Sequence, residues 1–212
     1  DKISVIYNGT KIIKKTNSST SNSIRIISVG RLAPWKNIDT IINSIEKLNR
    51  ADSNKYTLTL VGDGPIRHEL EEIIVEKRLE DSIVITGQVS SNEVARYLEE
   101  ADVYIQASGY EGLPHVILEA MNYNLSVIST PIGGTNEVLK DGKYGWILPL
   151  ENGKKPNSNE LVRIIKEVGN NKEKDNQIKE AAFTMLEEKF DENTNLNKYL
   201  EVIGSERKTN NV

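Results

Sequence analysis

The sequence contains no cysteine, which excludes a disulfide framework and any metal site built on thiolates. A reducing cytoplasm is therefore the simplest setting. No run of apolar residues approaches the roughly 18 that a membrane-spanning helix needs. The formal net charge of −4 comes from charges of both signs, which argues against a nucleic-acid platform. Histidine occurs only twice, and no group of His, Asp and Glu has the spacing of metal ligands.

What the sequence does contain is a regular alternation of short β-rich runs and helical patterns. Of its 212 residues 37% are hydrophobic and 27% are charged, which fits one globular domain with a full core plus appendages. The expected strands are residues 24–29, 57–61, 83–86, 103–106, 126–129 and 145–148. Strands and helices that alternate at this interval predict an α/β fold with a Rossmann-like, doubly wound parallel sheet.

Glycines and polar residues fall directly after these strands. They are Arg31, Gly62, Gly87, residues 108–111 and the pair Gly133 and Gly134. Because ligands of open parallel sheets bind beyond the carboxyl ends of the strands, we expect these residues to converge on one rim.

The most informative stretch is SGYEGLPHVILEAM, residues 108–121. Glu111 lies in a loop of small residues, and a helix should begin near Pro114, whose missing N–H suits the first helical position. Glu119 follows on that helix, roughly 7 Å along its axis from the first turn. The helix start attracts anions, and a carboxylate at either end accepts hydrogen bonds from hydroxyl groups. A sugar, a diphosphate and a ribose in that order match this layout.

The spacing Glu111-x7-Glu119 resembles the signature of the retaining glycosyltransferases with the GT-B fold, known as glycosyltransferase family four or glycosyl transferases group one. Further segments resemble motifs of that family in order and spacing. They are the G-R-x4-K loop at residues 30–36, V-G-x-G-P at 61–65, G-x-V-S at 87–90 and G-G-x-x-E at 133–137. The resemblance covers nearly the whole chain and implies the C-terminal half of a GT-B fold, the donor-binding domain.

The resemblance implies a role for each matching residue. Arg31 and Lys36 would neutralise the donor diphosphate in place of a metal ion, so no metal or other cofactor is expected. Glu111, the third catalytic candidate, would lie beside the donor sugar, and Glu119 would hold the ribose hydroxyls. The other donor-binding candidates are Gly87, Val89, Gly112, Leu113, His115, Gly133 and Gly134. A helix-surface position for His115 and a plain turn at the glycine pair are the simpler alternatives.

Two asparagines stand at or beside positions where the sequence departs from the family's pattern. Asn37 follows Lys36 and is a good helix N-cap, so we expect only a local change of loop shape. Asn124 precedes residues that replace a Gly-Pro pair, and asparagine tolerates the left-handed conformation that glycine would supply. We therefore expect that turn to survive.

The chain is predicted to comprise three parts. Residues 1–23 form an interdomain crossing segment and a flexible loop, 24–189 the nucleotide-sugar-binding domain, and 190–212 a crossover helix, expected over 193–203, with a frayed tail. The first residue is Asp1 and not Met, as in a fragment of a longer protein. We therefore expect the chain to need its own N-terminal GT-B domain, which carries the acceptor groups.

The sequence thus predicts the donor half of a hexosyltransferase, inactive alone. Its partners would be a nucleotide-sugar donor, such as a UDP-sugar or GDP-mannose, and a glycan or lipid-linked acceptor; no nucleic acid is expected. The predicted location is cytoplasmic, and a lipid acceptor would bring the enzyme to the inner membrane face. Two alternatives stay open: a sugar-nucleotide epimerase of related fold, which cleaves donor without an acceptor, and a non-catalytic nucleotide-sugar-binding module.

Overall fold

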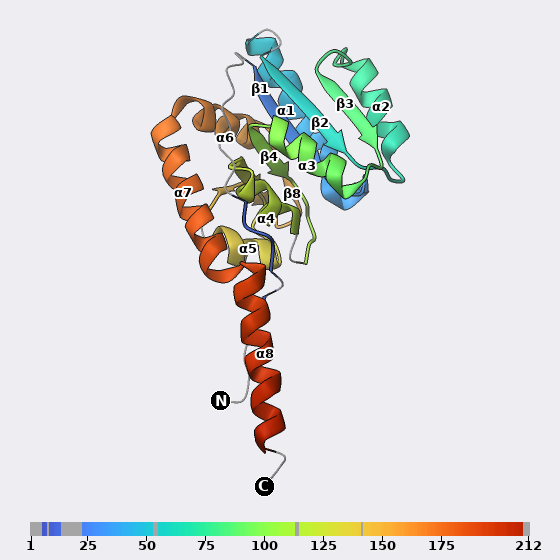
Figure 1. Cartoon of the computed structure of the whole chain (residues 1–212). Helices are drawn as coiled ribbons and strands as arrows, with labels where there is room; N and C mark the ends of the chain where they lie inside the picture. The colour runs from blue at the N-terminus through green and yellow to red at the C-terminus, as the bar shows by residue number, and fades with distance from the viewer. Residues whose placement is uncertain are drawn as a thin grey trace.

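The computed structural model describes residues 6–7, 9–13, 23–52, 55–112, 115–140 and 142–209, with side chains as far as residue 203. Six strands in this part of the chain form one parallel sheet, and helices lie on both of its faces (Figure 1). The strands are β1 (Ile24–Val29), β2 (Tyr56–Val61), β3 (Ile83–Gly87), β4 (Val103–Gln106), β5 (Ser126–Ser129) and β6 (Trp146–Ile147). All six lie where the hydrophobic pattern predicts them.

The strand order is β3-β2-β1-β4-β5-β6, and every neighbouring pair is parallel. The chain winds outward from β1 to β3, then returns to the other side of β1 with β4. The connections that follow β1 and β4 therefore lead toward opposite edges of the sheet. Doubly wound sheets bind ligands in the crevice between the carboxyl ends of two such strands.

Two apolar cores cover the two faces of the sheet. Ile26 and Ile27 are successive residues of β1, and because side chains alternate along a strand they enter different cores. On the face of Ile26 pack α1 (Ile38–Ala51), α2 (Arg67–Glu76) and α6 (Ser158–Asn170). On the face of Ile27 pack α3 (Ser91–Glu100), α4 (His115–Asn122), α5 (Gly134–Leu139) and α7 (Lys172–Lys189).

Local signals in the sequence determine several element ends. The side chain of Ser90 accepts a hydrogen bond from the Glu93 amide and the Glu93 carboxylate accepts one from Ser90, which is the predicted capping box of α3. Asn124 has a φ of 58°, so the expected left-handed turn before β5 is confirmed. A hairpin of β7 (Leu150–Glu151) and β8 (Lys155–Pro156) was not predicted. Its signal was the pair Asn152 and Gly153, both at positive φ as in a hairpin turn.

Hydrogen bonds fix the segment 9–13 against the end of α4 and the residue that follows α7. The Thr10 amide donates to the Phe190 carbonyl at 2.7 Å, and the Asn122 side chain donates to the Lys11 carbonyl at 3.0 Å. The last helix, α8 (Glu192–Thr209), extends away from the domain (Figure 1). The predicted end at Ile203 is wrong, because the helix continues to Thr209. The frayed tail stays a prediction.

The proposed division at residues 23 and 189 stays a prediction, and most of its first part lies outside the described residues. Within the described part of the chain, no helix combines the length and the apolar character that crossing a bilayer requires.

Candidate functional site

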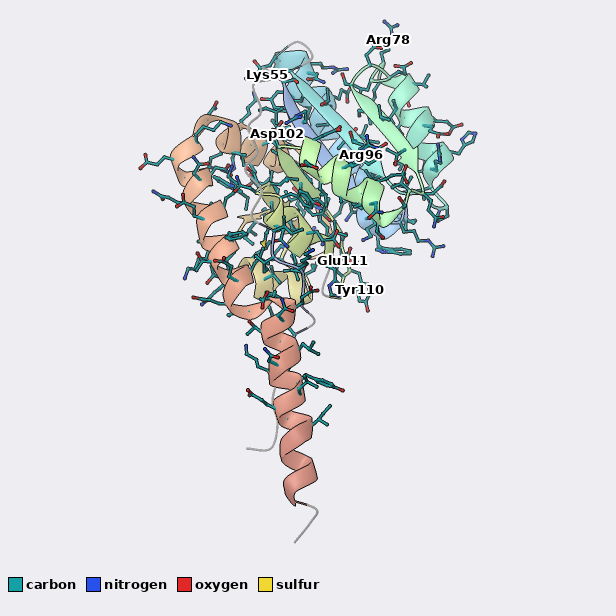
Figure 2. All side chains as sticks on the ribbon, in the orientation of Figure 1. Lys55, Arg78, Arg96, Asp102, Tyr110 and Glu111 are labelled. Atoms are coloured by element: carbon teal, nitrogen blue, oxygen red, sulfur yellow. The ribbon has the colours of Figure 1, made fainter. Side chains whose placement is uncertain are left out.

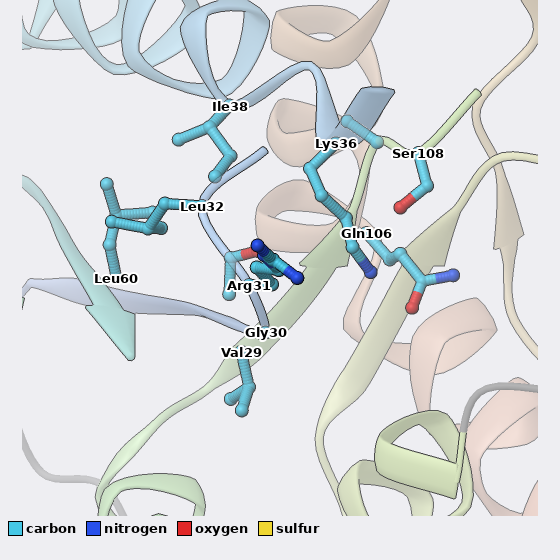
Figure 3. A pocket seen from close by; sticks show the side chains of 11 residues that line it. Val29, Gly30, Arg31, Leu32, Lys36, Ile38, Leu60, Gln106 and Ser108 are labelled. Atoms are coloured by element: carbon cyan, nitrogen blue, oxygen red, sulfur yellow. The ribbon is translucent and has the colours of Figure 1, made fainter. Parts of the chain in front are cut away.

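A pocket lies at the carboxyl edge of the sheet, between the ends of β1 and β4. The loop after β1 contributes Arg31 and Lys36, and the end of β4 contributes Gln106 and Ser108 (Figure 3). Figure 2 shows Glu111 at this edge, while Asp102, which precedes β4, lies at the other end of the strand. The pocket therefore occupies the switch point that the sheet topology defines.

Lys36 and Glu111 form the centre of this site. The Lys36 ammonium makes an ion pair with Oε1 of Glu111, and the same oxygen accepts a hydrogen bond from the Ser108 hydroxyl at 2.8 Å. The exposed fractions of the two charged side chains are 20% for Lys36 and 15% for Glu111, so the pair is largely shielded from solvent. Ser108 is itself held, because Thr130 donates to its carbonyl at 2.6 Å.

Glu119 lies in an adjoining cavity of about 390 Å³, lined also by Lys11, Val94 and Val29. Val29 lines the switch-point pocket too, so the two spaces share a wall. Tyr104 is buried, and its pKa is raised, first by burial and then by the charges of Glu111 and Glu119. Arg31, Lys36, Glu111 and Glu119 thus occupy one rim of the sheet.

The remaining donor-binding candidates are spread along the same rim. Gly87 ends β3 with a φ of 75°, and Val89 follows it half-buried. His115 begins α4 with an exposed side chain, and Gly112 is exposed before it. Leu113 lies outside the described residues, so its predicted role stays a prediction.

The first glycine of the pair after β5, Gly133, has a structural reason that the sequence did not reveal. A Cβ on Gly133, whose φ is 48°, would lie 2.1 Å from the carbonyl oxygen of Glu111. The Gly134 amide donates to the Gly112 carbonyl at 3.0 Å. Gly133 therefore gives the backbone of Glu111 the space it occupies, and contact with a sugar stays a prediction.

Asn37 has a different role from the expected helix cap. It stands at the N-cap position of α1, but its side chain makes no capping hydrogen bond. Its φ of 49° is left-handed, which explains why a glycine suits this position. The side-chain amide instead donates to the Ala107 carbonyl at 2.8 Å. With the Gly109 amide donating to the Trp35 carbonyl at 2.7 Å, this bond joins the Lys36 loop to the Glu111 loop.

Replacing Asn37 by alanine is expected to lower the free energy of unfolding by about 2–5 kcal/mol. The change leaves the buried Ala107 carbonyl without its donor, at about 1–3 kcal/mol, and places a Cβ without a compensating hydrogen bond in the left-handed region, at about 1–2 kcal/mol. Asn37→Gly removes the same hydrogen bond but tolerates the backbone, so it should cost less. Urea denaturation of both variants checks this, and equal losses would contradict the role of φ.

The described residues contain no group of three or more His, Cys, Asp or Glu side chains placed to hold a metal ion. A metal-independent reaction stays a prediction. The positive charges at the switch point come from Arg31 and Lys36.

A parallel six-stranded sheet in this order, with a charged rim at its switch point, defines a Rossmann-like α/β domain. Residues 10–185 match the family model described as Glycosyl transferases group 1. The chain belongs to this family, as the resemblance of its motifs predicted.

Two named glycosyltransferases that are similar in sequence are longer than this chain. The amylovoran biosynthesis glycosyltransferase AmsK of Erwinia amylovora is 29% identical over 70% of this chain and 39% of its own length. The alpha-D-kanosaminyltransferase of Streptomyces kanamyceticus is 30% identical over 58% of this chain and 32% of its own length. The chain spans less than half of either relative.

Solved structures confirm the fold. Anabaena Alr3699/HepE in complex with UDP matches with a TM-score of 0.80 and 25% identity, over 95% of this chain and 57% of that one. The C-terminal domain of the group 1 glycosyl transferase LpcC from Francisella tularensis matches with a TM-score of 0.72 over 86% of this chain and 99% of its own. Its 18% identity supports the fold alone. The predicted fold class, the C-terminal half of a GT-B fold, is confirmed.

Proposed function

We propose that this chain is the donor-binding half of a retaining glycosyltransferase, which moves a hexose from a nucleoside diphosphate sugar to a glycan or lipid-linked acceptor. The observation that carries the proposal is the contact between Lys36 and Glu111 at the switch point, with Arg31 beside them and Glu119 in the adjoining cavity. Membership of the family and the complexes of HepE with UDP and with UDP-glucose support it.

Each charged group of the rim suits one part of such a donor. The cations of Arg31 and Lys36 suit the diphosphate, because an arginine binds phosphate oxygens through two donors and a lysine as a point charge. The carboxylates of Glu111 and Glu119 suit hydroxyl groups, which donate to ionised oxygens. Glu111 lies next to Lys36, and Glu119 lies in the adjoining cavity. A donor along this rim would therefore place its sugar at Glu111, its diphosphate at the cations and its ribose at Glu119.

In the proposed reaction the bond between the sugar C1 and the diphosphate oxygen breaks, and a bond from C1 to the acceptor oxygen forms on the same face. The acceptor hydroxyl gives its proton to the leaving diphosphate. Arg31 and Lys36 stabilise the charge that develops there, so neither a metal nor a protein nucleophile is required. The acceptor groups would lie in a part of the enzyme beyond this chain, and we expect the chain alone to bind donor without transfer.

A panel of UDP-, GDP- and ADP-sugars tests the proposal by thermal shift. A true donor present at 100 times its dissociation constant should stabilise the chain by about 2.7 kcal/mol. Replacing Glu119 by glutamine should weaken that donor about 10- to 100-fold, because charge-assisted hydrogen bonds to the ribose, worth about 1.5–3 kcal/mol, are lost.

The matched control is Glu173→Gln, the same change on an exposed residue of the first turn of α7, next to the lining of a cavity at the opposite edge of the sheet. Its donor affinity should equal that of the wild type. If no nucleotide sugar stabilises the chain, or if Glu119→Gln binds as tightly as the control, the proposed donor site is wrong.

A further inference from the structure

We infer that the ion pair between Lys36 and Glu111 makes this site select a nucleotide that carries a sugar over the bare nucleoside diphosphate. The inference rests on the proposed function and goes beyond it, since it assigns discrimination between donor and product to a contact between two side chains of this chain. The pair links the cation suited to the diphosphate with the carboxylate suited to the sugar.

The Lys36 ammonium is held by a contact within the chain itself. It contacts Oε1 of Glu111 and lies 3.5 Å from the place that a Cβ on Gly30 would occupy, so it extends over the end of β1 into the switch-point pocket. Because both charges are mostly shielded from water, separating them is more costly than separating a surface pair.

The carboxylate side of the pair is the less mobile one. Ser108 donates to the same oxygen of Glu111 at 2.8 Å, and the Glu111 backbone packs into the space left by Gly133. The loop is further tied by the bonds of Asn37 to Ala107 and of Gly134 to Gly112 described above. When a diphosphate enters, the flexible lysine side chain is therefore the partner that moves.

A diphosphate that draws Lys36 toward itself leaves Glu111 with Ser108 as its remaining donor in the described contacts, close to the new negative charge. A sugar hydroxyl beside Glu111 replaces the contact with the Lys36 ammonium by a hydrogen bond to the carboxylate. A bare nucleoside diphosphate brings no such donor to Oε1 of Glu111. Loss of the ion pair thus disfavours binding of the bare nucleoside diphosphate. Only a donor that carries a sugar compensates for this loss. The same difference would favour release of the nucleotide after transfer.

Replacing Glu111 by glutamine tests this by calorimetric titration with UDP, GDP and ADP and with UDP-glucose, GDP-mannose and ADP-glucose. For the nucleotide that the wild type prefers, Glu111→Gln should bind the bare diphosphate at least tenfold more tightly, which corresponds to about 1.4 kcal/mol. The preference for the sugar form should shrink by the same factor or more. The matching nucleoside, which has no phosphate, should bind equally to both proteins.

Two further variants show whether the tighter binding comes from loss of the ion pair or from removal of any negative charge near the diphosphate. Glu119→Gln makes the same chemical change in the adjoining cavity and should weaken the bare diphosphate. Ser108→Ala keeps the charge but removes the second donor to Glu111, so the bare diphosphate should bind about threefold more weakly. This variant also tests the inference if Glu111→Gln does not fold.

The results distinguish this inference from the proposed function. If the wild type binds nucleotide sugars but Glu111→Gln binds the bare diphosphate no more tightly, the selective ion pair is refuted and the proposed function stands. If Ser108→Ala binds the bare diphosphate more tightly than the wild type, the selective ion pair is likewise refuted. If no nucleotide binds to any variant, both the inference and the proposed function are overturned.

Discussion

Replacing Asp175 by alanine is expected to lower the free energy of unfolding by about 3–5 kcal/mol, the usual cost of removing one partner of a buried ion pair. Asp175 lies on α7 and is 1% exposed. Its carboxylate accepts from Ser126 Oγ at 2.7 Å, from Trp146 Nε1 at 3.0 Å and from Lys179 Nζ at 2.9 Å. One side chain thus joins α7 to β5 and β6.

The loss is large because three donors lose their acceptor at once. Ser126 and the Trp146 indole are buried, and Lys179 keeps only 19% of its side chain exposed, so water replaces the carboxylate poorly. Equilibrium urea denaturation of the chain measures the change.

Two variants act as controls for this measurement. Asp175→Asn keeps the size and one acceptor oxygen, and should cost less than alanine. Glu180→Ala removes an exposed carboxylate from the same helix and should stay within about 0.5 kcal/mol of the wild type. A loss below about 1 kcal/mol for Asp175→Ala would mean that the network contributes little beyond packing.

Under the proposed function, replacing Lys36 by methionine in the full-length enzyme is expected to lower kcat about 10²- to 10³-fold, the usual effect of removing one preorganised donor from a developing negative charge. Methionine keeps most of the length and the apolar stem, so the loop after β1 should keep its shape. Initial rates at saturating donor measure the change in kcat separately from KM.

Lys172→Met is the matched control, because Lys172 lines a cavity with Asp102 and Ser126, which lie at the amino ends of β4 and β5. Its rates should equal those of the wild type. If Lys36→Met raised KM and left kcat within tenfold, Lys36 would bind the donor without stabilising the leaving group.

Much of the fold could be predicted because its signals are local. Strand positions follow from short apolar runs, and the capping box at Ser90 and the left-handed turn at Asn124 depend on residues within a few positions. That Arg31 and Glu111 occupy one rim followed from a general property of parallel sheets, whose ligand loops share an edge. The position of the site therefore needed no knowledge of side-chain contacts.

What could not be predicted depends on contacts between distant parts of the chain. Asp175 stands in a run of charged residues typical of a solvated helix, and two of its three donors, Ser126 and Trp146, are distant in the sequence. Asn37 was expected to cap a helix, whereas its amide reaches across to Ala107. The ion pair of Lys36 was equally hidden, because the sequence fixes the types of the two residues but not their distance.

The fit between Gly133 and the Glu111 backbone limits how this site can be re-engineered. Any side chain at position 133 would displace the loop that carries the carboxylate, since its Cβ would overlap a carbonyl oxygen. A Cβ on Gly112, by contrast, would meet nothing within 4 Å. Mutant libraries meant to broaden donor scope should therefore diversify position 112 and leave 133 untouched.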